Sequence, residues 1–126
     1  MARPADCHPT SRVEWFPAMH DFADLERRID GLCARASSAE RDARLLVEIE
    51  DLLAEGYVCA LHGDRRSRRL QMRLDALLEA SASASELQRL AGEQRMVADA
   101  TRRLREQLAV MREHWVALGS ERLGLV

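Results

Sequence analysis

The residue pair best suited to metal chemistry in this chain is Cys59 and His62. Because they lie three positions apart, they would project from one face of a helix and could supply half of a zinc site. No second pair with metal-ligand spacing completes the site, since the other candidates are scattered at Cys7, His8, His20, Cys33 and His114. We therefore expect no metal and no cofactor, and we interpret Cys59 as a small thiol in a tight helix contact.

Residue patterns that would indicate an enzyme are missing. A di-metal carboxylate site in a helical bundle needs Glu-x-x-His, and no glutamate lies three positions before His20, His62 or His114. The sequence holds no glycine-rich phosphate loop, and no serine stands in a nucleophile elbow. The serines gather where helices are expected to break, which capping explains. We expect a protein without catalytic activity.

Arginine clusters offer a second kind of site. Every basic side chain other than histidine is arginine, 19 in total. The two densest groups are Arg65, Arg66, Arg68 and Arg69, and then Arg102, Arg103 and Arg105. If a hairpin brings them together, they would form a basic patch able to grip a phosphate backbone. Flanking Asp64 and Asp75, and the lack of interleaved aromatics, favour instead a solvated face with ion pairs inside the chain.

Two adjacent aromatic residues near the start of the chain, Trp15 and Phe16, lie between prolines. All three prolines fall within residues 1–17, which show no helical periodicity and predict an extended or disordered arm. The two aromatics would either pack back on the domain or serve as a docking peptide for another protein.

The strongest pattern is an apolar ladder over residues 84–118, whose members are spaced alternately three and four apart. They are Leu87, Leu90, Gln94, Val97, Thr101, Leu104, Leu108, Met111, Trp115 and Leu118. This is the a and d spacing of a heptad repeat and predicts a helix that lies along another helix. Gln94 and Thr101 are polar, so they either set the register or mark where a third helix or water meets the seam.

A partner helix for this ladder is predicted over about residues 38–80. Its seam is Leu45, Ile49, Leu52, Gly56, Cys59, Gly63, Arg66, Leu70, Arg73 and Leu77. The small residues in the middle would admit a partner backbone or a bulky side chain. Gly63 could instead end one helix and Asp64 begin another, giving a four-helix bundle. Four arginines would then crowd a helix N-terminus, where the helix dipole disfavours cations, so we favour a continuous helix.

The remaining patterns complete an all-α fold. A first helix is predicted over residues 19–35, and the Ser-x-x-Glu patterns at Ser37 and Ser83 predict N-caps for the next two. Residues 18–119 would form one helical domain, with Gly119 as the C-terminal stop and residues 120–126 as a tail. We expect a long antiparallel coiled-coil hairpin with a shorter N-terminal helix beside it, and the four-helix bundle as the alternative.

Composition and net charge limit the partners and the cellular location that we expect. The chain has 126 residues, 32% of them charged, and a formal net charge of −2, so no global field attracts nucleic acid or membrane. Three scattered cysteines do not indicate a disulfide framework. No apolar run is long enough for a transmembrane helix, and the N-terminus lacks the apolar core of a secretory signal. We expect a cytoplasmic protein that does not contact membrane.

These observations favour a non-catalytic helical assembly, adaptor or regulatory protein that acts through its coiled-coil surface. The predicted second helix is acidic in its first half and basic in its second, so two copies packed antiparallel would match opposite charges. We expect a homodimer that also binds another protein. The alternative is a nucleic-acid-associated protein that uses the two arginine clusters.

Overall fold

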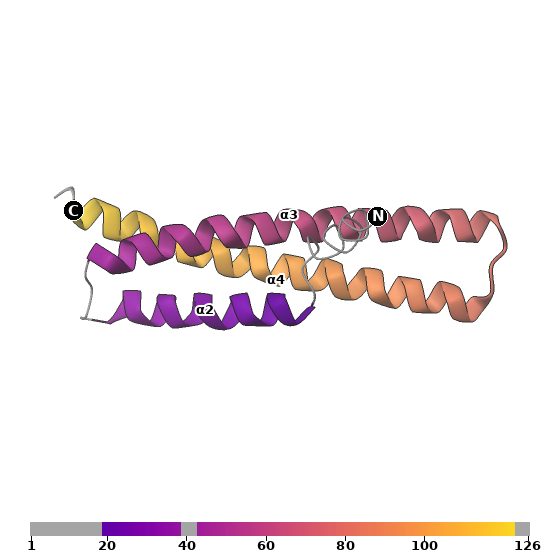
Figure 1. The fold of residues 1–126 in the computed structure, drawn as a ribbon, viewed down its shortest axis with the longest axis horizontal. Coiled ribbons are helices and arrows are strands. Elements are labelled where there is room, and N and C mark those ends of the chain that lie inside the picture. The colour runs from indigo at the N-terminus through magenta and orange to yellow at the C-terminus, as the bar shows by residue number, and fades with distance from the viewer. Residues whose placement is uncertain (1–18, 39–42, 123–126) are drawn as a thin grey trace, which may run out of the picture.

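In the computed structural model, which describes residues 19–38 and 43–122, the chain folds into three helices. They are α2 (Met19–Ser37), α3 (Ala43–Glu79) and α4 (Ala84–Arg122). Figure 1 shows α3 and α4 as a long antiparallel hairpin, with α2 along the half of the hairpin that lies away from its turn. The predicted all-α hairpin with a shorter N-terminal helix is confirmed.

The turn between α3 and α4 is closed by the serine-rich segment. Ser81 adopts a left-handed conformation with a φ of 57°, and the backbone N–H of Ala82 donates to the carbonyl of Leu77 across it. The hydroxyl of Ser83 then accepts a hydrogen bond of 3.3 Å from the backbone N–H of Glu86. Ser83 is therefore the N-cap that the sequence predicted for the last helix.

Helix α3 runs without a break through Gly63, as the charge argument predicted, so the described residues do not form the four-helix alternative. Gly63 is buried, and a Cβ atom built there would lie 3.1 Å from Cζ of Phe22 and still closer to Oγ1 of Thr101. The glycine therefore provides space for side chains of α2 and α4 rather than a turn.

The core divides the hairpin into two parts. The larger cluster joins all three helices and includes Ile29 of α2, Ile49 of α3 and Leu108 of α4. Toward the turn, where α2 does not reach, a smaller cluster of Leu70, Leu90 and Val97 joins only α3 and α4. Three helices therefore stabilise one half of the molecule, and two helices stabilise the other.

Helix α2 packs through an apolar face with the expected spacing of three and four. Phe22, Leu25, Ile29, Leu32 and Ala36 are all buried. At the rim of this contact, Arg28 makes two hydrogen bonds to the carboxylate of Glu55, at 2.8 and 2.9 Å, and Arg35 reaches Glu48 at 2.8 Å. The bonds to Glu55 are the main cause of a raised pKa at Arg28. Both arginines attach α2 to α3.

Helix ends differ from those predicted. Helix α2 continues to Ser37, and the hydroxyl of Ser38 donates to the carbonyl of Arg35, so Ser37 is not the predicted N-cap. Its predicted partner Glu40 lies outside the described residues. Helix α4 continues through Gly119 to Arg122, because Gly119 keeps a helical backbone and neither a proline nor a left-handed residue stops the helix there.

Candidate interaction surface

The apolar ladder predicted as an interface lies mostly inside the single chain. On α4, Leu90, Val97, Leu104, Leu108 and Met111 are fully buried, while Leu87, Trp115 and Leu118 are half-buried. On α3 the buried members are Leu45, Ile49, Leu52, Gly56, Cys59, Gly63 and Leu70. The hairpin therefore uses this seam to hold α3 against α4. A surface for a partner has to be found elsewhere.

The small residues of the α3 seam receive side chains from the other two helices. A Cβ atom added to Gly56 would collide with the methyl groups of Leu108, and one added to Gly63 would collide with Thr101. Of the two roles that the sequence left open for these residues, the structure shows space for bulky side chains of the same chain.

The polar seam residues are satisfied within the chain. The amide of Gln94 donates to the hydroxyl of Ser67 across the α3–α4 contact, at 3.0 Å. The buried hydroxyl of Thr101 donates to the carbonyl of Val97 at 2.7 Å, and its side chain lies where Phe22 of α2 meets the seam. Thr101 therefore marks the entry of a third helix, which was one of the two interpretations of its polarity.

The indole N–H of Trp115 donates to the carboxylate of Glu50 at 3.0 Å, which fixes the register of the hairpin. A hairpin that turns near residue 82 puts residue 114 opposite about residue 50, and this contact agrees with that register. His114 consequently lies far along the hairpin from His62. No cluster of three or more potential metal-binding side chains occurs in the part of the chain that the structure describes.

Cys59 is buried in the α3 seam, as interpreted from the sequence. Burial raises the pKa of its thiol from the usual 9.0 to about 11, with smaller contributions from Asp21 and Glu55. Burial also raises the pKa of the less buried Cys33. Neither thiol has the depressed pKa of a reactive cysteine.

The Cys59 thiol makes the stability of the fold depend on alkaline pH. The unfolded chain releases this proton near pH 9 and the folded chain near pH 11, so we expect the free energy of unfolding to fall as the pH rises between these values. Urea denaturation at pH 8 and pH 10.5 would measure this loss. The variant Cys59→Ala should lose less stability over the same interval, and an equal loss in both proteins would contradict the assignment.

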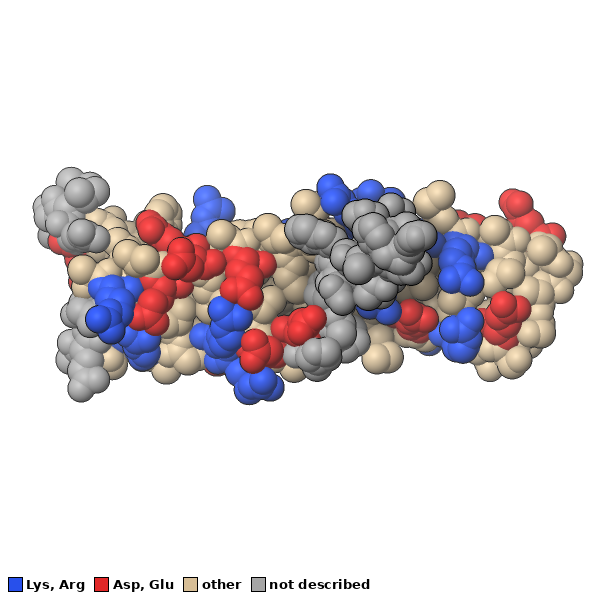
Figure 2. Space-filling view, in the orientation of Figure 1, with Lys and Arg blue, Asp and Glu red and all other residues tan. Residues whose placement is uncertain are grey.

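The second arginine cluster is paired inside the chain, and the first is paired in part. Arg66 pairs with Glu93 and Arg105 with Asp64, whereas Arg103 reaches Glu26 of α2 at 3.5 Å. Arg102 pairs along its own helix with Asp99 and Glu106. Figure 2 shows acidic and basic side chains interspersed on the face in view. Intra-chain ion pairs therefore account for Arg102, Arg103, Arg105 and Arg66 but not for the whole first cluster, and nucleic-acid binding stays a prediction from the sequence.

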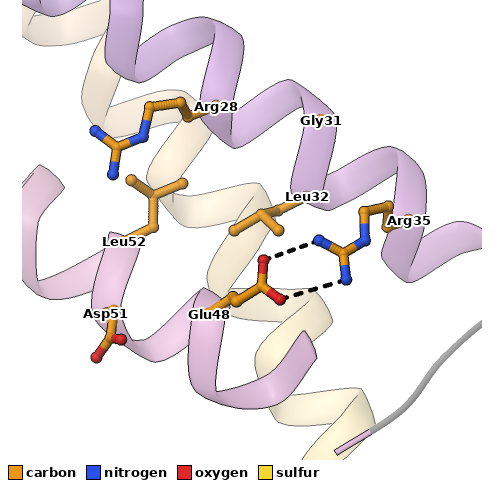
Figure 3. Close-up of a pocket in the computed structure, with 7 residues that line it drawn as sticks. All are labelled: Arg28, Gly31, Leu32, Arg35, Glu48, Asp51 and Leu52. Atoms are coloured by element: carbon orange, nitrogen blue, oxygen red, sulfur yellow. Dashed lines mark hydrogen bonds and ion pairs between the residues drawn. The ribbon is translucent and has the colours of Figure 1, made fainter. Parts of the chain in front are cut away.

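A groove of about 460 Å³ lies between α2 and α3, beside the ion pairs that Arg28 and Arg35 make with α3. Leu32 and Leu52 line it, and Arg35 and Glu48 bond to each other across it (Figure 3). Its charged groups therefore serve the contact between the helices. Asp51 is different, because its side chain has no hydrogen bond or ion pair within the described residues, and Figure 3 draws its carboxylate away from Arg28 and Arg35.

A second heptad pattern, which we call the outer stripe, follows the side of α3 that faces away from its seam. It begins two positions after Leu45, with the same spacing of three and four, and all its members are exposed. The outer stripe is Val47, Asp51, Ala54, Val58, Leu61, Arg65, Arg68 and Met72. In Figure 1, α3 forms the upper edge of the molecule over most of its length, with α4 and α2 below it, and the end of α4 lies above the start of α3. This surface was not among the sites predicted from the sequence.

The outer stripe combines exposed apolar side chains with charged side chains that have no partner within the described residues. Val47, Val58, Leu61 and Met72 are 51%, 52%, 45% and 64% exposed, at positions that are normally the most polar of a bundle helix. Within the described residues, the side chains of Asp51, Arg65 and Arg68 have no ion pair or hydrogen bond. Neighbouring charges such as Glu55 and Asp64, by contrast, are paired inside the chain.

Comparisons with known proteins add no assignment to this geometry. No family model, curated protein or solved structure matches the chain. Among the described helices, none combines the length and the apolar character needed to cross a membrane.

Proposed function

We propose that this protein is a non-catalytic helical assembly protein whose interaction surface is the outer stripe of α3. The observation that carries the proposal is the row of four half-exposed apolar side chains at positions that face away from the core. Single exposed apolar residues are common on protein surfaces, but several of them on one heptad-spaced face of a helix offer a surface to a partner helix. The seam that the sequence singled out cannot serve this purpose, because it is buried between α3 and α4.

The test is the solution mass of the purified chain across a concentration series, measured by light scattering at low and high salt. We expect the native chain to associate, and we expect Val58→Glu with Leu61→Glu to have the mass of one chain, because buried carboxylates without partners oppose association. Val110→Glu is the matched control, since Val110 is 49% exposed but lies on α4. It should associate like the native chain.

Circular dichroism would show that each variant keeps its helices, which we expect because the three valine and leucine positions are exposed. Retained association in high salt would agree with an apolar contact. A native chain that stays a monomer at every concentration would overturn the proposal. Equal association of the double variant and the Val110→Glu control would place the contact on another surface and would also overturn it.

A further inference from the structure

We infer that the outer stripe binds the outer stripe of a second copy of this chain in antiparallel orientation, with Asp51 of each copy against Arg68 of the other. This inference rests on the proposed function and specifies its partner. It begins from the symmetry of the stripe about the point midway between Cys59 and Ala60. A two-fold axis through that point would bring together the pairs Val47 and Met72, Asp51 and Arg68, and Val58 and Leu61.

Each of these pairs is chemically matched. Val58 and Leu61 are apolar and meet at the centre, where the axis repeats the contact. Val47 and Met72 form apolar contacts at both ends of the stripe. The fourth pair places the small Ala54 against Arg65, whose long aliphatic stem can cover it while the guanidinium group reaches water. The stripe is therefore complementary to its own reversed copy along its whole length.

The charged pair fixes the orientation. Asp51 and Arg68 are the oppositely charged members of the stripe that meet, and both are without partners within the described residues. In a parallel pair of helices, Asp51 would face Asp51 and Arg68 would face Arg68, and such like-charge contacts are unfavourable. The antiparallel arrangement replaces both repulsions with two ion pairs. Free charge of both signs thus indicates a second copy of this chain rather than a uniformly charged partner.

The experiment exchanges the two charges. A homodimer of the Asp51→Arg variant would contain two Arg–Arg contacts. A homodimer of the Arg68→Asp variant would contain two Asp–Asp contacts. We expect the dissociation constant of either variant to rise at least tenfold. An equimolar mixture of the two variants should associate again, because both contacts of the mixed pair then join Arg to Asp. The double variant Asp51→Arg/Arg68→Asp should also associate with itself.

Controls separate this inference from the proposed function. Glu113→Arg changes the charge of an exposed residue of α4 and should leave the dissociation constant unchanged. If the native chain associates and Val58→Glu with Leu61→Glu abolishes association, but the charge-exchanged mixture stays dissociated, the antiparallel pairing is wrong and the proposed function survives. If the native chain does not associate, both fail. Recovery in the mixture, with neither variant associating alone, would support both.

Discussion

Replacing Gly63 by alanine is expected to destabilise the fold by about 1–3 kcal/mol, the usual range for overpacking a core. The new methyl group would meet Thr101 on one side and Cζ of Phe22, at 3.1 Å, on the other. Because Thr101 branches at Cβ and its Cβ atom would itself lie 3.3 Å away, rotating its side chain does not relieve the contact. We expect the loss to appear as a lower urea midpoint.

Gly92→Ala is the matched control for this prediction. Gly92 also lies inside a helix, but nothing lies within 4 Å of the position of its added Cβ atom. Alanine there should stabilise the fold by about 1 kcal/mol through helix propensity alone. The two variants should therefore move the free energy of unfolding in opposite directions. If both stabilise the fold, the close approach at Gly63 is contradicted.

A double-mutant cycle would identify the colliding group. Thr101→Ala removes the hydroxyl group, which is the atom nearest to the added Cβ at Gly63, so the Gly63→Ala substitution should cost less in that background than in the native chain. All measurements should use one protein concentration, because association adds to the apparent stability. Strictly additive effects would indicate that Phe22, rather than Thr101, limits the space.

The periodicity of α4 was sufficient to predict the hairpin. Its ladder was nearly free of polar interruptions, so the buried face of α4, its partner seam on α3 and the register near Trp115 followed from spacing and from the position of the serine turn. The sequence favoured the continuity of α3 through Gly63 less strongly than it favoured the hairpin. It followed from electrostatics at a hypothetical helix start rather than from any preference of glycine.

Contacts that join distant segments were not predictable. The pairing of Arg103 with Glu26, and of Arg28 with Glu55, depends on where α2 lies against the hairpin, and its own pattern does not specify that position. The outer stripe, in contrast, was visible in the sequence as a second heptad pattern offset by two residues. The stronger seam obscured it, and only the exposure of Val58 and Leu61 distinguishes the two.

Replacing Ile29 by alanine is expected to lower the free energy of unfolding by about 2–5 kcal/mol, the usual range for removing a large aliphatic side chain from a core. Ile29 is 1% exposed and lies in the cluster that joins α2 to both helices of the hairpin. The adjacent variant Arg28→Ala removes the ion pair with Glu55, but both side chains are about half exposed. An exposed ion pair contributes at most about 1 kcal/mol.

Comparing the stability of these two variants shows whether apolar burial or ion pairing attaches α2 to the hairpin. If burial of its apolar face dominates, Ile29→Ala will shift the urea midpoint several times further than Arg28→Ala. An equal or larger shift for Arg28→Ala would show that the ion pairs dominate. Because Ile29 is buried between α2 and the hairpin, whereas the apolar members of the outer stripe are exposed, neither variant should change the dissociation constant of self-association while the chain stays folded. Loss of association in Ile29→Ala under folding conditions would mean that α2, rather than the outer stripe, makes the contact between copies.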